Sequence, residues 1–196
     1  MDTLRYVVAL LLIVAVPAAI GYWLLIHPLA RFWRRRGPTT AYAVVLPLVG
    51  ALMAGMVSLR HRLLGADCGL SPPLALAGLG FLLVSGVLLR RLRRKLTLGT
   101  LVGVPELSAT PGGLITDGMY ARVRHPRYVQ MTLAILGYAL IANFPAAYGA
   151  LLFWCAGIYA VVLLEERELA ARFGAAWEDY CRRVPRFIPR LRHPRA

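Results

Sequence analysis

Two short groups of ionisable residues flank a long apolar stretch of this chain. The first group contains Arg124, His125 and Tyr128, and the second is Glu165 and Glu166. Arginine and histidine bind carboxylates, whereas glutamates bind ammonium or sulfonium groups. A pocket that contained both groups would therefore suit a zwitterionic ligand with additional positive charge.

The same residue types also have a purely structural interpretation. Arg, His and Tyr are common at the cytoplasmic ends of membrane helices, where they anchor the helix at the interface. Glu168 and Arg172 are four residues apart, so the glutamates could belong to a solvated extension of a helix. Charged groups beside membrane helices are costly, which favours a functional role, but the residues alone leave both interpretations open.

The elements that carry these residues are predicted to be membrane helices. Hydrophobic residues make up 59% of the 196 positions, and the mean hydropathy is +0.61, which is typical of an integral membrane protein. A helix needs about 20 apolar residues to cross the hydrocarbon core. We predict an all-α integral membrane protein with five transmembrane helices, over residues 4–26, 41–59, 73–89, 129–143 and 146–164.

The basic residues predict the orientation of these helices. On one side of the membrane the connecting segments would hold only Arg5, Arg60 and Arg62, and the other twenty of the 23 basic residues would lie on the opposite side. Because short cytoplasmic loops collect Lys and Arg, the N-terminus is predicted outside and the C-terminus in the cytoplasm. A cleaved signal peptide ending near residues 15–19 is the competing interpretation, but it would invert this arrangement against the charge rule.

Helix geometry explains how the two ionisable groups could meet. The chain between Tyr128 and Glu165 has room for two helices of about 17 residues, each about 25 Å long. A turn at residues 143–145 would join them, so the hairpin returns to the side it left. Pro126 would fall in the first turn of its helix, where the missing N–H costs nothing. His125 and Glu165 are therefore expected to line one pocket at the cytoplasmic boundary.

Two segments flank this hairpin, and the first of them could line the pocket or be a plain connector, which is the more common role of a loop. Residues 96–119 contain Pro and Gly that interrupt helices, which predicts a cytoplasmic linker. Phe173, Trp177 and Tyr180 recur at helical spacing and predict a C-terminal helix whose aromatic face packs against the bundle or the headgroup layer rather than against a ligand. We thus divide the chain into residues 1–95, with three membrane helices and basic loops, and residues 96–196, with the pocket.

Several other function classes lack support in the sequence. The net charge of +14 comes from basic clusters that directly follow apolar stretches, so anionic lipid headgroups explain it better than nucleic acid does. Cys and His residues form no short-spaced cluster, so no metal site is expected. Neither a glycine-rich dinucleotide motif nor a phosphate-binding loop is present.

A set of motifs in a fixed order resembles the isoprenylcysteine carboxyl methyltransferase family, within a superfamily of membrane methyltransferases that includes phospholipid methyltransferases. The resemblance covers about residues 114–191. Its motifs are Gly118-Met119-Tyr120, Val123-Arg124-His125-Pro126-Arg127-Tyr128, Glu165-Glu166-Arg167-Glu168-Leu169, Phe173-Gly174, Tyr180 and Val184-Pro185-Arg186-Phe187-Ile188-Pro189.

The resemblance implies that S-adenosylmethionine binds between the last two helices, the linker and the C-terminal tail, and that a lipophilic acceptor enters from the bilayer. It implies a role in cofactor binding for Tyr120, which could also be an interfacial aromatic, and for Arg124, His125, Tyr128, Glu165 and Glu166. The two glutamates are the candidate catalytic residues, because an amine acceptor would need a base. The expected location is the inner membrane of a bacterium, with the site facing the cytoplasm.

One departure from the family pattern concerns Gln130, which stands where members usually have a small residue, often Gly. A larger side chain there could narrow the pocket and change the acceptor. The predicted reaction is methyl transfer to a small lipophilic acceptor, and a phospholipid amine or a thiol is the alternative acceptor. An NADPH-dependent membrane reductase and a non-catalytic membrane protein remain as alternatives of other classes.

Overall fold

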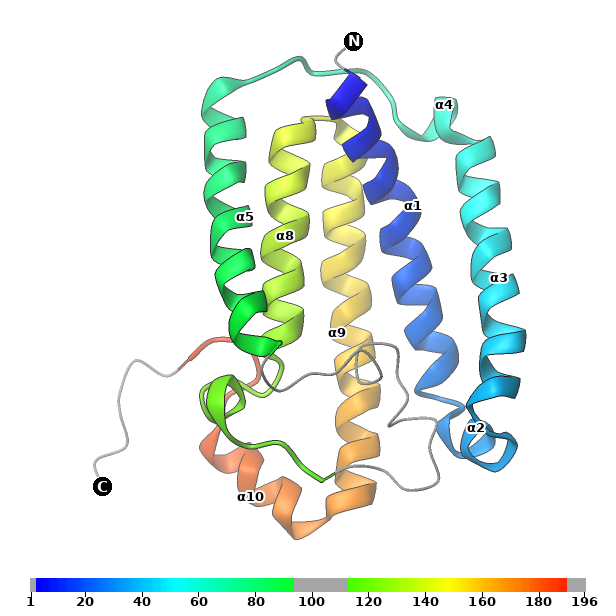
Figure 1. Cartoon of the computed structure of the whole chain (residues 1–196), viewed down its shortest axis with the longest axis vertical. Coiled ribbons are helices and arrows are strands. Elements are labelled where there is room, and N and C mark those ends of the chain that lie inside the picture. Colours follow the sequence, from blue (N-terminus) through cyan, green and yellow to red (C-terminus); the bar gives the residue numbers. More distant parts are fainter. Residues whose placement is uncertain (1–2, 94–112, 190–196) are drawn as a thin grey trace.

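The computed structural model describes residues 3–93 and 113–189, and every regular element in these ranges is a helix (Figure 1). The helices are α1 (Thr3–Ile26), α2 (Ala30–Arg36), α3 (Pro38–Ser58), α4 (Arg60–Leu63), α5 (Pro72–Leu92), the 3-10 helix η1 (Gly118–Ala121), α8 (Pro126–Ala142), α9 (Pro145–Phe173) and α10 (Ala175–Arg183). Most of the linker predicted over residues 96–119 lies outside the described residues.

Four helices are long and apolar enough to cross a membrane, namely α1, α3, α5 and α9. They confirm four of the five predicted spans and indicate an integral membrane protein. The fifth, α8, has 17 residues, about one turn fewer than the hydrocarbon core requires. It nevertheless runs alongside α5 and α9 in the bundle (Figure 1). The fifth span and the orientation of the bundle therefore stay predictions.

Proline determines where several of these helices begin. Pro38, Pro72, Pro126 and Pro145 each occupy the first position of a helix, where the fixed φ angle favours the helix and no hydrogen bond is lost. Asn143 ends α8 in the left-handed conformation, with φ of 52°, which Asn tolerates better than most residues. The predicted tight turn between α8 and α9 is thus confirmed.

The core of the bundle lies between α1, α8 and α9. Trp154, Val161 and Val162 of α9 are at most 1% exposed there, and the indole N–H of Trp154 donates to the Thr132 hydroxyl at 2.8 Å. In contrast, only 11% of the residues in the 18-residue apolar stretch of α3 are buried, and the same holds for α5. Leu83 of α5, for example, is 72% exposed. Such exposed apolar faces fit contact with lipid.

Close contact between α5 and α8 fixes the position of α8. A Cβ atom on Gly78 would lie 2.6 Å from the Gly137 carbonyl oxygen, so a larger side chain would force the two helices apart. Further along the same pair of helices, the side-chain amide of Gln130 donates to the Ser85 hydroxyl at 2.8 Å. That hydroxyl in turn donates to the backbone carbonyl of Gln130 at 3.1 Å. α5 therefore supports the helix that carries the first ionisable group.

The C-terminal helix α10 folds back against the end of the bundle (Figure 1). Trp177 and Tyr180 are 5% and 2% exposed, and they pack with Phe173, Leu169 and Leu114. This packing agrees with the interpretation of the aromatic stripe as a packing face. It places the segment after α10 next to the start of α8.

Candidate functional site

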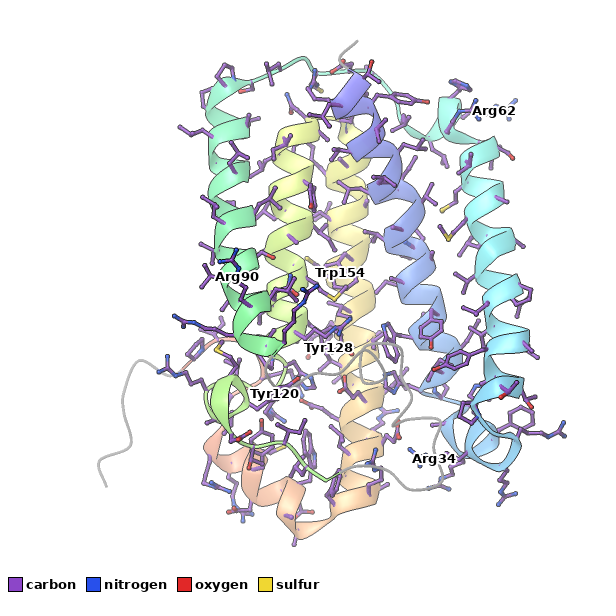
Figure 2. All side chains as sticks on the ribbon, in the orientation of Figure 1. Arg34, Arg62, Arg90, Tyr120, Tyr128 and Trp154 are labelled. Atoms are coloured by element: carbon purple, nitrogen blue, oxygen red, sulfur yellow. The ribbon has the colours of Figure 1, made fainter. Side chains whose placement is uncertain are left out.

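The candidate site lies where the start of α8, the C-terminal half of α9 and the segment after α10 meet. Figure 2 shows Tyr120 and Tyr128 at this end of the bundle, and Trp154 deeper between the helices. Two backbone hydrogen bonds join the segments: the Arg124 N–H donates to the Pro185 carbonyl at 2.8 Å, and the His125 N–H donates to the Arg186 carbonyl at 3.1 Å. The C-terminal segment thus holds the motif residues just before α8.

Glu166 is the centre of an ionic cluster. His125 Nε2 lies 3.0 Å from Glu166 Oε1, and Arg124 Nη1 lies 3.0 Å from the same oxygen. Arg186 makes a bidentate contact, from Nε to Oε1 at 3.0 Å and from Nη2 to Oε2 at 2.6 Å. We call Arg124, His125, Glu165, Glu166 and Arg186 the Glu166 cluster. Because three cationic or donor side chains converge on Glu166, it is suited to position them.

Glu165 has a more open environment than Glu166. The Tyr128 hydroxyl donates to Glu165 Oε2 at 2.9 Å, and His125 Nδ1 lies 3.7 Å from the same oxygen. The side chain of Glu165 is 24% exposed, compared with 12% for Glu166. Among the described residues both contacts of Glu165 use one oxygen, so this carboxylate has more capacity to bind a cationic ligand.

Arg124 retains a hydrogen-bond donor that its neighbours do not use. Its guanidinium contacts Glu166, the sulfur of Cys181 and the face of the Trp177 ring, 5.8 Å from the ring centroid. Its Nε is buried and has no hydrogen-bond partner within residues 3–93 and 113–189. A buried N–H without a partner costs free energy, so an anionic group of a ligand would be favoured beside it.

Tyr120 joins the same region from η1. Tyr180 fastens this short helix by donating from its hydroxyl to the Tyr120 carbonyl at 2.7 Å. Burial, and secondly the negative charge of Glu165, raise the pKa of Tyr120 to about 12. The phenol therefore stays neutral at physiological pH. The structure thus brings all six predicted site residues to one end of the bundle.

Sequence reasoning gave no site role to Arg186, although its motif was recognised. Arg186 contacts both carboxylate oxygens of Glu166 with a single guanidinium, at 3.0 and 2.6 Å, and its neighbour Phe187 lies 6.0 Å from His125 between ring centroids. The available signal was a basic residue inside the closing Val184-Pro185-Arg186 motif. Its partner could not be inferred without the fold.

An apolar pocket of about 310 Å³ adjoins the Glu166 cluster. It lies between α8 and α9 and is closed at one side by the segment after α10. Its lining residues are Tyr128, Val129, Thr132, Leu133, Cys155, Ile158, Tyr159, Phe187 and Ile188. Tyr128 belongs to the pocket wall and also donates to Glu165. Tyr128 therefore links the pocket to the ionic cluster.

The side chain of Gln130 turns toward α5 and not toward this pocket. It is 7% exposed, and its amide group hydrogen-bonds Ser85. Its size is accommodated between helices, so the structure gives a packing reason for Gln at a position where a small residue was expected.

Comparisons with known proteins agree with the motif resemblance. The profile of the phospholipid methyltransferase family matches residues 74–176. The match begins in α5, well before residue 114, which fits the close packing of α5 on α8. No solved structure gives a significant match to the chain.

Three curated relatives match over parts of their length. Methanethiol S-methyltransferase 2 from Bradyrhizobium diazoefficiens is 43% identical over 83 residues, covering 39% of this chain and 29% of that protein. Protein-S-isoprenylcysteine O-methyltransferase from Schizosaccharomyces pombe is 38% identical over 77 residues, covering 39% and 33%. A Delta(14)-sterol reductase from Gallus gallus is 34% identical over 84 residues, covering 40% and 13%.

The matched segments thus span about a third or less of these relatives. The family profile, in contrast, covers more than half of the present chain, from α5 to the start of α10. The chain therefore belongs to the phospholipid methyltransferase family.

Proposed function

We propose that the protein is an integral membrane methyltransferase that takes its methyl group from S-adenosylmethionine and transfers it to a lipophilic acceptor. The observation that carries this proposal is the side-by-side position of the Glu166 cluster and the apolar pocket, which are linked by Tyr128. The cluster offers both charge types to a zwitterionic donor, and the pocket offers an apolar surface to an acceptor.

The residues of the cluster fit the donor. The unused Nε of Arg124 suits the carboxylate of its amino-acid part. The exposed side of the Glu165 carboxylate suits an ammonium or sulfonium group. When bound, the donor supplies an activated methyl group, and in the transfer its carbon–sulfur bond breaks as the bond to the acceptor forms.

The two glutamates then have different roles. Glu166 positions His125 and Arg124, because its oxygens already accept hydrogen bonds from the cluster. Glu165 faces the ligand, and with an amine acceptor it would be the base that takes the proton. A carboxylate or thiolate acceptor would need no base. We thus propose Glu165 as the catalytic residue and Glu166 as a positioning residue.

The apolar pocket supports an acceptor with an apolar body. Its volume of about 310 Å³ is at the lower end of the range for small-molecule sites. Tyr159 is 49% exposed and Ile188 is 81% exposed, so the pocket opens at the side of α9 through which a molecule could enter from lipid. Enclosing the reacting atoms here would exclude water and hold the methyl group in line with the nucleophile.

The comparisons suggest specific alternatives for the reaction. The methanethiol S-methyltransferase favours a thiol acceptor, and the family profile favours a phospholipid. The sterol reductase favours a different class, a reduction, and an NADPH-dependent membrane reductase is therefore the alternative to test. The expected location is the inner membrane of a bacterium with the site facing the cytoplasm, as the distribution of basic residues predicts.

The decisive experiment is a binding measurement on the purified protein in detergent. Isothermal calorimetry with S-adenosylhomocysteine should show binding, and NADPH should show none. His125→Ala and Glu165→Gln should each weaken binding of S-adenosylhomocysteine by roughly tenfold or more, as expected for the loss of one charge-assisted contact. Glu178→Gln is the matched control, since Glu178 is an exposed residue of α10. Binding of NADPH alone, or unchanged affinity in both site variants, would refute the proposal.

The acceptor can be identified in a second step. Membranes that contain the protein would be incubated with methyl-labelled donor, and the labelled product would be extracted and identified. Label is expected in the apolar extract with the wild type, and less label is expected with Glu165→Gln.

A further inference from the structure

A second pocket, of about 320 Å³, lies on the other side of α9. It is formed by the connection from α1 to α2, by α2 itself and by the C-terminal part of α9. We call it the α2 pocket. Figure 2 shows Arg34, one of its lining residues, beside α2 and away from Tyr120 and Tyr128. The methyl-transfer site described above uses none of its residues.

Glu168 holds the walls of the α2 pocket together. Its carboxylate forms ion pairs with Arg34 of α2 and, at 3.9 Å, with Arg172 of α9. Its Oε2 also lies 3.2 Å from His27 Nδ1. Trp23 stacks on the His27 ring, with 5.2 Å between centroids. Contacts from α2, from α9 and from the connection between α1 and α2 therefore fix the shape of the pocket.

Positive charge exceeds negative charge in this pocket. Four arginines line it, together with the single acidic residue Glu168. Two of the four, Arg31 and Arg167, are exposed and form no ion pair with any described residue. They come from different elements, α2 and α9, and both line the pocket, so an anion in it would meet positive charge from two sides. Guanidinium groups match the geometry of phosphate oxygens.

The remaining lining indicates that the ligand also has an apolar part. Pro28, Ala30, Leu164 and Ala171 complete the wall. Leu164 is the last residue of the apolar stretch predicted to lie in the membrane, so this wall adjoins the level at which lipid headgroups lie. A soluble anion would gain nothing from the apolar wall, whereas a phospholipid would contact both parts of the pocket.

We propose that the α2 pocket binds the phosphate group of an anionic lipid headgroup, held between Arg31 and Arg167. This site is independent of the proposed methyltransferase function. Free inorganic phosphate shares the recognised chemistry, and the experiment separates the two sources.

The test measures binding of short-chain lipids to the purified protein in uncharged detergent. Dihexanoyl phosphatidylglycerol, dihexanoyl phosphatidylcholine and inorganic phosphate would be titrated separately, with affinity measured by calorimetry. We expect the anionic lipid to bind more tightly than the zwitterionic one. In the double variant Arg31→Gln/Arg167→Gln the anionic lipid should bind roughly 30-fold more weakly, because each basic residue near an anionic headgroup adds to the binding free energy.

The matched control is Arg35→Gln/Arg36→Gln, which removes the same charge from exposed positions of α2 outside the pocket lining. Binding that this control preserves and the pocket variant loses supports the proposal. If inorganic phosphate displaces the anionic lipid, the phosphate group alone suffices for binding. If it does not, the lipid is required. Equal binding of the two lipids, or equal loss in both double variants, overturns the proposal.

Discussion

Two groups of ionic contacts occupy opposite ends of the helix bundle, and they differ in what they join. At one end Arg5, whose side chain is 4% exposed, donates to the Ala142 carbonyl from Nε at 3.1 Å and from Nη2 at 2.9 Å. It also pairs with Asp67. At the other end the Glu166 cluster joins α8, α9 and the C-terminal segment through side chains.

The partners explain why only one of these clusters is a candidate site. Arg5 connects the start of α1 to the end of α8 and to the segment before α5, so each of its bonds stabilises the packing of the helices. The Glu166 cluster adjoins a pocket and includes a buried donor on Arg124 that no described residue accepts. A charge in a membrane protein is a reason to look for function. A buried, unused donor in a cluster that adjoins a pocket is the more specific indication.

The largest effect is expected for Glu166→Gln. The neutral amide would leave His125, Arg124 and Arg186 without their common counter-charge, and each charge-assisted hydrogen bond contributes about 1.5–3 kcal/mol. We expect binding of S-adenosylhomocysteine to weaken about 100-fold, as measured by calorimetry. Glu178→Gln should bind as the wild type does. A loss smaller than threefold would mean that Glu166 does not organise a ligand site.

Arg5→Gln tests the other end of the bundle. The variant loses hydrogen bonds to a buried carbonyl, so the free energy of unfolding should fall by about 2 kcal/mol, as measured by chemical denaturation in detergent. Affinity for S-adenosylhomocysteine should stay within about twofold of the wild type, because the two clusters share no partner. The exposed Arg62 supplies the control Arg62→Gln. Lost affinity at unchanged stability would contradict the division between a structural and a functional cluster.

Local signals explain which parts of the fold could be predicted from the sequence. Apolar length defined four spans, and proline and Asn143 defined the start of α9 and the turn before it. The hairpin then placed His125 near Glu165 by length alone. These features depend on residues close together in the chain, so the sequence was sufficient.

The remaining features depend on which helices pack together. The contact of Gly78 with Gly137 places α5 against α8, but two glycines 59 positions apart in the sequence give no sign of their pairing. The same holds for Arg186, whose partner lies on α9, and for the apolar pocket, whose wall combines two helices and the tail. The motif order suggested that these segments cooperate, although it could not assign the individual contacts.

A smaller effect is expected for Tyr128→Phe, which tests the link between cluster and pocket. The variant keeps the ring, which stacks on His125 with 5.8 Å between centroids, and removes only the hydroxyl that donates to Glu165. Loss of one such hydrogen bond should weaken binding of S-adenosylhomocysteine about fivefold to tenfold. Tyr138→Phe, at a 43% exposed position of the same helix, is the control. Equal affinity in both variants would show that the hydroxyl does not order Glu165 for the ligand.

The smallest effect on binding is expected for Gln130→Ala, one turn or less from Tyr128 on the same helix. Its amide contacts Ser85 of α5, so the substitution should lower the free energy of unfolding by about 1 kcal/mol and leave affinity for S-adenosylhomocysteine unchanged. Ser85→Ala should lower stability at least as much, because it also removes the hydrogen bond from the Ser85 hydroxyl to the Gln130 backbone carbonyl. The double variant should lose less than the sum of the two, because both changes remove the hydrogen bond between the two side chains. If Gln130→Ala instead changed affinity tenfold at constant stability, the side chain would act on the ligand site, and the contrast between packing and binding residues along α8 would fail at this position.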